Sequence, residues 1–282
     1  MVLPLNTANR YYGCRGECSE RSLWIYHRLA QDPEPVETVF IGSSRTISAF
    51  EDALISEVHP HTVNMGFCRL GRDLQYQLLT DLLRYKSPKT VYLEIRSSEN
   101  DVSHPVAPYF LESAHLLSAP IRQNPDYFTN LWKHGVFKLS AFQNLIYGRE
   151  DTLGNHRSTG YPIWVDDRIW QADQGAFDPS RNASKEVKPV SGLARYYLQA
   201  MADVCAEHDV QLKFIYLPSA KTIGAAIDTA SYHIWSDQLF YVPNDILTNP
   251  NYWSDADHFN HDGAVAVSRC FLGKMNGNSL NN

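Results

Sequence analysis

The stretch Val-Glu-Thr-Val-Phe-Ile-Gly-Ser-Ser-Arg, residues 36–45, joins a short apolar run to a polar turn. The run Val36–Ile41 is typical of a buried strand, which Gly42 closes. Ser44 follows at a strand-to-helix turn, and we expect a helix to begin near Ser48. A serine in this position often caps a helix, but it can also present its hydroxyl to a cleft beside backbone N–H groups.

Strands and helices alternate on both sides of this stretch. Further strands are expected at Thr62–Met65, Thr90–Ile95, Gln211–Leu217 and Leu239–Val242. Helices are expected at 19–31, Arg72–Tyr85, Leu193–His208, 219–230 and Gly263–Leu272. The pattern predicts an α/β fold with a three-layer, flavodoxin-like parallel sheet of about five strands and helices on both faces. Ligands bind beyond the C-terminal ends of such strands, where Ser44, Gly66 and Arg96 fall.

Residues 97–190 interrupt this alternation after the third strand. We expect an insertion with two or three helices, one over about 125–147, packed over one end of the sheet. Its aromatic residues would form a satellite core or contact a substrate. They are Tyr109, Phe110, Tyr127, Phe128, Trp132, Phe137, Phe142, Tyr147, Tyr161, Trp164 and Trp170. Residues 1–35 would form an N-terminal extension and helix, and 36–282 the domain that contains the insertion.

Composition argues against two classes of partner. The net charge is −6 in a chain of 282 residues, whereas nucleic-acid binders are usually basic. No apolar run reaches the length of a membrane span, which needs about 18 residues. The start, Met1–Asn6, has no signal-peptide pattern. No cofactor is predicted, and the oligomeric state stays open.

The five cysteines include one close pair, Cys14 and Cys18. Because no second pair exists, the spacing is not that of a zinc site. A local disulfide and two free thiols both remain open for this pair. Cys205 and Cys270 fall in helical patterns and are expected to be small core residues, and nothing near Cys68 would activate it as a nucleophile.

The segment Asp255-Ala256-Asp257-His258-Phe259-Asn260 places a carboxylate three residues before a histidine. On one loop, this offset lets Asp255 hold the Nδ1–H of His258 and stabilise the imidazolium. Asp257 is a competing partner, although an immediate neighbour tends to point elsewhere. An acidic first turn of the last helix is the alternative. No metal site is predicted over 255–262, because such sites usually draw ligands from distant segments as well.

Residues at the ends of the strands are candidates for binding developing negative charge. The N–H groups of Ser44 and Gly66 could form an oxyanion hole, although a turn glycine is the plainer interpretation of Gly66. Arg96 could donate as well. Glu94 could hold this guanidinium or pair with Arg45, which makes both candidate substrate-binding residues. A purely structural ion network of these three charged residues remains open.

The order of these motifs resembles that of the SGNH/GDSL hydrolase superfamily. Within it, the chain is similar to polysaccharide-associated members, namely alginate O-acetyltransferase relatives and the D-alanine-transfer proteins of teichoic acid. The resemblance covers 36–96 and 191–275, about half of the chain. It implies Ser44 as nucleophile, Asp255 and His258 as its triad partners, and Gly66 as an oxyanion donor. The family's third motif, Gly-x-Asn-Asp, is replaced here by Glu-Ile-Arg-Ser, so Arg96 would stand in for the asparagine.

The leading hypothesis is a serine esterase that removes ester-linked acyl groups, such as acetyl, from a carbohydrate or another small ester. A carbohydrate O-acyltransferase with the same triad is one alternative. A non-catalytic glycan-binding module, in which Arg96 marks the loss of catalysis, is another. The resemblance implies a periplasmic or extracellular role in the bacterial envelope.

Overall fold

The structure is a computed structural model that describes residues 7–14, 19–99, 101–118, 121–146, 168–172, 174–182 and 187–275. These residues contain a five-stranded parallel sheet in the order β2-β1-β3-β4-β5. Its strands are β1 (Thr38–Ile41), β2 (Thr62–Asn64), β3 (Thr90–Ile95), β4 (Gln211–Tyr216) and β5 (Leu239–Tyr241). The chain is therefore the α/β protein that the alternation predicted, with the strand order of the flavodoxin-like arrangement.

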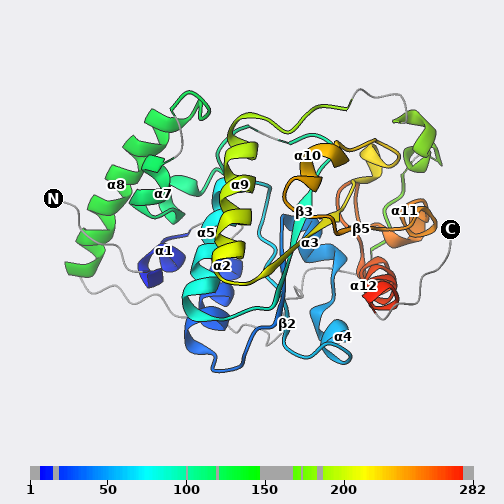
Figure 1. Ribbon diagram of the computed structural model, residues 1–282, viewed down its shortest axis with the longest axis horizontal. Coiled ribbons are helices and arrows are strands. Elements are labelled where there is room, and N and C mark those ends of the chain that lie inside the picture. Colours follow the sequence, from blue (N-terminus) through cyan, green and yellow to red (C-terminus); the bar gives the residue numbers. More distant parts are fainter. Residues whose placement is uncertain are drawn as a thin grey trace.

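Helices cover both faces of the sheet (Figure 1). One face carries α2 (Ser19–Tyr26), the π-helical turn η1 (His27–Gln31), α5 (Arg72–Tyr85) and α9 (Gly192–Glu207). The other carries α3 (Ser44–Ala49), α4 (Asp52–Ser56) and α12 (His261–Met275). The short elements α1 (Thr7–Gly13), α11 (Asn244–Leu247) and η5 (Pro250–Tyr252) flank these layers. None of the described helices combines the length and apolarity needed to cross a bilayer.

Side chains of each strand alternate between two cores. Val39 and Ile41 pack in the core beneath α5 and α9. Phe40 points to the opposite core, where it stacks on Phe50 at 4.2 Å between ring centroids and meets Phe271 at 5.1 Å. A strand buried on both faces is apolar at successive positions, which explains the apolar residues 39–41 of β1.

The insertion between β3 and α9 divides between two places. Its described elements are α6 (Ala107–Phe110), α7 (Ser113–Ser118), α8 (Tyr127–Ile146), η2 (Gln174–Phe177) and η3 (Pro179–Arg181). The helix α6 packs against α1 and α5, whereas η2 contacts η4 (Ala220–Thr222) near the loop before α12. The described parts of the insertion thus have different partners, α6 beside α1 and α5 and η2 beside η4.

Two expected helices differ from the structure. The helix after β1 begins at Ser44 and not near Ser48, because the Ser43 hydroxyl accepts the Arg45 N–H at 3.2 Å and caps it. The helix expected over 219–230 is instead η4 followed by α10 (Thr229–His233). Between them Gly224 has a φ of +79°, a left-handed conformation that ends regular helix.

The cysteines resolve part of the open question from the sequence. Cys14 is a free, buried thiol, so it is not bonded to Cys18, which lies outside the described residues. Burial raises the pKa of the Cys14 thiol to about 11. Cys68 is disulfide-bonded. Cys205 is buried and Cys270 half-buried, both as free thiols.

Candidate functional site

The side chains of Ser44, His258 and Asp255 form a continuous hydrogen-bonded chain. Ser44 Oγ lies 2.8 Å from His258 Nε2. On the other side of the ring, His258 Nδ1 lies 2.9 Å from Asp255 Oδ2 and 3.0 Å from Oδ1. These distances give the imidazole a hydroxyl on one nitrogen and a carboxylate on the other, which is the arrangement that lets a serine lose its proton.

Ser44 is presented by a tight turn between β1 and α3. Gly42 allows this turn, because a Cβ atom at that position would lie 1.8 Å from Thr46 Oγ1 and 2.6 Å from Glu94 Oε2. Ser43 is the helix cap, so Ser44 occupies the first position of α3. Backbone N–H groups in the first turn of a helix have no partner within the helix and can bind an anion.

The Glu94 carboxylate lies beneath this turn and is fully buried. It accepts hydrogen bonds from the Ser43 N–H at 2.7 Å, the Ser43 hydroxyl at 2.8 Å and the Thr46 hydroxyl at 2.7 Å. Burial raises the pKa of Glu94, but the Arg96 and Arg45 guanidiniums outweigh it and lower the pKa to about 2. Glu94 is therefore a permanent anion that fixes the backbone next to Ser44.

Arg96 connects the end of β3 to the same turn. Its Nε pairs with Glu94 Oε1 at 3.1 Å and its Nη2 donates to the Ser43 hydroxyl at 2.9 Å. Behind it, Tyr232 donates to the Arg96 carbonyl at 3.2 Å and to the carboxylate of Glu99, which is also paired with buried Arg72. The Arg96 guanidinium is thus held one residue from Ser44, at the point where the strand order reverses between β1 and β3.

The two ends of the loop that carries His258 pair with each other before α12 begins. Trp253 and Phe259 form an antiparallel bridge and stack at 4.3 Å between centroids. Asn260 ties the loop to the helix, because its Oδ1 accepts the Gly263 N–H at 2.9 Å and its Nδ2 donates to the Asn251 carbonyl at 2.6 Å. Trp253 is fully buried, so the loop has a rigid base.

Asp255 orients more than the imidazole. Its Oδ1 also accepts the backbone N–H groups of Asp257 at 2.7 Å and His258 at 3.0 Å. Partial burial raises the pKa of Asp255, but the hydrogen bonds from the His258 ring and these N–H groups outweigh it and hold the pKa below the ordinary value. The carboxylate therefore stays ionised at neutral pH, as a partner of an imidazolium must.

Asp257 turns away from His258 and meets Arg45. Arg45 Nη2 lies 2.6 Å from Asp257 Oδ1, and Nη1 donates to the Leu217 carbonyl at 3.3 Å. This contact joins the helix of the serine to the loop of the histidine. Both candidate substrate-binding residues are thus paired within the protein. Arg45 pairs with Asp257, and Glu94 pairs with Arg96.

Gly66 lies at the end of β2 beside the start of α3. Its N–H donates to Asn64 Oδ1 at 2.9 Å, so an oxyanion would have to share or replace this hydrogen bond. The Asn64 amide also donates to the Thr46 and Phe50 carbonyls, at 2.9 and 2.8 Å, and thereby joins the end of β2 to α3. From the other side, Arg21 donates to the Gly66 carbonyl at 2.8 Å.

The aromatic residues of the insertion have mixed environments. Phe110, Tyr127 and Phe177 are buried. Trp170 is half-buried against Phe177, and its backbone N–H donates to the Trp253 carbonyl at 2.7 Å, so it adjoins the base of the His258 loop. Tyr147, Tyr161 and Trp164 lie outside the described residues, as does the side chain of Phe142.

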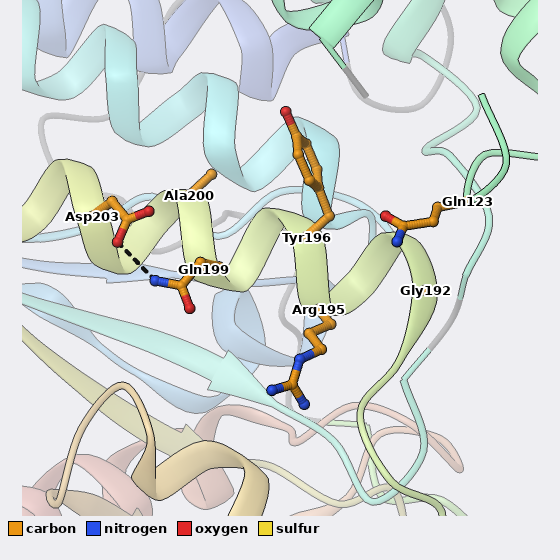
Figure 2. A pocket seen from close by; sticks show the side chains of 7 residues that line it. All are labelled: Gln123, Gly192, Arg195, Tyr196, Gln199, Ala200 and Asp203. Carbon is orange, nitrogen blue, oxygen red and sulfur yellow. Dashed lines mark hydrogen bonds between the residues drawn. The ribbon is translucent and has the colours of Figure 1, made fainter. Parts of the chain in front are cut away.

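A separate hollow of about 450 Å³ lies along α9 (Figure 2). Its lining consists of Gln123, Gly192, Arg195, Tyr196, Gln199, Ala200 and Asp203. None of these is among the residues around Ser44. The Gln199 side chain is hydrogen-bonded within the protein, since it donates to Asp203 at 2.7 Å and accepts from Trp235 at 2.8 Å.

Some contacts at the site were not predicted from the sequence. Ser43 was not singled out, although its hydroxyl meets both Glu94 and Arg96, and the Arg45–Asp257 pair was missed. The adjacency of Ser43 to the candidate nucleophile was the available signal. In the ranges that the structure describes, no group of three or more His, Cys, Asp or Glu side chains is placed to hold a metal ion.

Comparison with known proteins adds a distant structural likeness. No family model and no curated protein matches the chain. Among solved structures, the chain is similar to a "putative acylhydrolase" from Bacteroides fragilis, with a TM-score of 0.44 and 11% sequence identity. The match covers 90% of this chain and 95% of that chain.

Proposed function

We propose that this protein is a serine esterase that cleaves ester-linked acyl groups through an acyl-enzyme. The observation that carries the proposal is the 2.8 Å contact between Ser44 Oγ and His258 Nε2, two residues separated by 214 positions. Ser44 attacks the ester carbonyl while His258 takes its proton and passes it to the leaving alcohol. Water then attacks the acyl carbon and gives a proton to His258. His258 returns this proton to Ser44 Oγ as the carboxylic acid departs.

The developing oxyanion needs hydrogen-bond donors at the same edge of the sheet. In this proposal the Ser44 N–H is one donor, because it lies in the first turn of α3. Arg96 is the second, since its guanidinium is fixed on the residue before Ser44. A charged donor stabilises an oxyanion more strongly than the neutral amide of the family motif. The Gly66 N–H would be a third donor if it released Asn64.

We also propose that the chain is related to the SGNH/GDSL hydrolases. The strand order and the positions of Ser44 after β1, Gly66 after β2 and Asp255–His258 before the last helix support this relationship. The choice of a carbohydrate ester, such as an O-acetylated sugar, rests on the resemblance to the polysaccharide-associated members. The domain would span 36–282, with 97–190 as its insertion.

Solvent access favours hydrolysis over transfer to a second alcohol. The side chains of His258 and Asp255 are 27% and 55% exposed, so water can approach the imidazole. An acyltransferase with the same triad would instead need to keep water from the acyl-enzyme. The disulfide at Cys68 supports a periplasmic or extracellular location, because disulfides persist in oxidising compartments.

The proposal is tested by hydrolysis of p-nitrophenyl acetate and by labelling with a fluorophosphonate. Ser44→Ala should abolish both turnover and the mass increase of one covalent adduct. Ser48→Ala is the matched control in the same helix, and it should retain both. Equal turnover by the wild type and Ser44→Ala would reject the mechanism. Turnover that requires an added glycan alcohol would favour transfer, and absence of both signals would favour a binding module.

A further inference from the structure

The helix α8 is oriented with its polar side inward. Its buried positions include Tyr127, Asn130 and His134, the last of which bonds to the Pro108 carbonyl at 2.7 Å. The Asn130 amide nitrogen is buried without a hydrogen-bond partner in the described part of the chain. A helix on the surface of a water-soluble protein normally turns such residues outward and buries its apolar side.

The outward side of α8 is apolar instead. Phe128 and Trp132 are 70% and 76% exposed, and Leu139 is 61% exposed. Leu131 and Val136 extend the same side, and a Cβ atom added at Gly135 would meet nothing within 4 Å. We call Phe128, Leu131, Trp132, Val136 and Leu139 the α8 apolar face. At helical spacing these positions lie within one broad stripe, and such contiguous exposure marks an interaction surface.

The charges around this face indicate what it contacts. Tyr127–Ile146 contains Lys133 and Lys138 and no Asp or Glu, in a chain whose net charge is −6. Lys133 is exposed, and so is Arg122 just before the helix. Lys138 is turned inward, where it donates to the Ser113 hydroxyl, and half-buried Asp126 directly precedes the helix. A face of Phe, Leu and Trp with an exposed cation at its edge and no carboxylate on the helix itself is typical of helices that lie in the interface of an anionic bilayer. Tryptophan in particular is favoured at the level of the lipid headgroups.

We propose that the α8 apolar face docks the protein on the surface of an anionic phospholipid membrane. Phe128, Trp132 and Leu139 would enter the boundary between headgroups and acyl chains, and Lys133 would meet lipid phosphates. A second copy of the chain fits this face less well. A symmetric contact through it would bring the lysines of two helices together without acidic partners on the helix.

The docking face lies apart from the proposed catalytic site. Figure 1 places α8 at the left of the molecule, beyond α5 and α9, whereas α3 and α12 lie on the opposite side of the sheet. Membrane binding should therefore be independent of esterase activity. Substitutions that abolish vesicle binding should leave ester hydrolysis intact, and substitutions that abolish hydrolysis should leave vesicle binding intact.

The test is cosedimentation of the full chain with vesicles of phosphatidylcholine, with or without phosphatidylglycerol. The wild type should bind the anionic vesicles, and Phe128→Asp/Trp132→Asp should lower the bound fraction at least about tenfold. Lys133→Glu should weaken binding to anionic vesicles only. The control is Ile234→Asp, a similar change at a residue that is 60% exposed in another part of the fold, and it should bind as the wild type does.

Unchanged hydrolysis of p-nitrophenyl acetate, or an unchanged circular dichroism melting curve if the chain has no esterase activity, would show that these variants fold. Wild-type protein that stays in the supernatant with anionic vesicles would overturn the proposal. Equal binding by Phe128→Asp/Trp132→Asp would do so as well. A wild-type dimer in light scattering that the double variant converts to a monomer would assign the face to a second copy instead.

Discussion

The carboxylate of Glu94 accepts the backbone N–H of Ser43 at 2.7 Å, directly before the candidate nucleophile. Glu94 lies near the end of β3, and Ser43 follows the end of the adjacent parallel strand β1. A buried anion in this place orients the turn and also neutralises the Arg96 guanidinium. The geometry of Ser44 thus depends on an ion pair that does not touch its hydroxyl.

Replacing Glu94 by Gln should therefore reduce stability in a pH-dependent way. Because the folded pKa of Glu94 is lowered to about 2, its contribution is fully present above the unfolded pKa and is lost as the pH falls toward 2. From an unfolded pKa of about 4.3, the contribution at neutral pH is about 3 kcal/mol. Urea unfolding of the wild type and Glu94→Gln should show a difference that narrows between about pH 4.3 and pH 2. A difference that is constant over this window would contradict the assignment.

Asp255→Asn should lower kcat on p-nitrophenyl acetate by about 10²–10⁴-fold with little change in KM. The amide oxygen can still accept backbone N–H groups, but it cannot stabilise the imidazolium. Asp262→Asn, which alters an exposed acid in the first turn of α12, is the control and should be nearly neutral. If both variants retain full kcat, Asp255 is only a loop residue.

Arg96 should contribute to the transition state as an oxyanion donor. Arg96→Met is expected to lower kcat by about 10²–10³-fold, whereas KM changes little, because the donor acts on charge that develops during the reaction. Arg96→Lys should restore part of the rate, since it keeps a charged donor. A rise in KM at constant kcat would instead identify Arg96 as a substrate-binding residue.

The Arg45–Asp257 pair should couple α3 to the His258 loop. In a double-mutant cycle with Arg45→Ala and Asp257→Ala, we expect a coupling free energy of about 0.5–1 kcal/mol for unfolding, because Asp257 is 45% exposed. High salt should reduce it. Each single variant should lower kcat less than about tenfold, as the serine and histidine keep their own contact. If the effects of the two substitutions on the free energy of unfolding add exactly in low salt, then other contacts hold α3 and the His258 loop together.

The sequence predicted the elements whose patterns are strong. Arg72–Tyr85 and Thr90–Ile95 have the expected bounds, because an amphipathic helix and a doubly buried strand leave clear periodicities. The helix expected over 219–230 was wrong, since the left-handed Gly224 approaches Pro179 in a contact between distant segments. The local offset between Asp255 and His258 was equally visible, so the carboxylate–imidazole contact could be predicted.

Contacts between distant segments had no local pattern. Whether Glu94 would pair with Arg45 or Arg96 was undecided by sequence, because both arginines lie near strand ends that meet only in the sheet. The α8 helix was expected over about 125–147, yet its pattern did not reveal which side faces the protein. Burial of Asn130 and His134 depends on the surface offered by α6 and α7, which the sequence of α8 does not contain.

The serine precedes its histidine by 214 positions, and this order has a consequence during synthesis. During translation, β1, Ser44 and Glu94 emerge from the ribosome long before the loop that carries His258. Under the proposed mechanism, the nascent chain would thus carry an unactivated Ser44 hydroxyl throughout most of translation. The Ser44 hydroxyl would become reactive only after α12 packs beside α3 and brings His258 to it. The proposed esterase activity would therefore appear only once the whole sheet has folded.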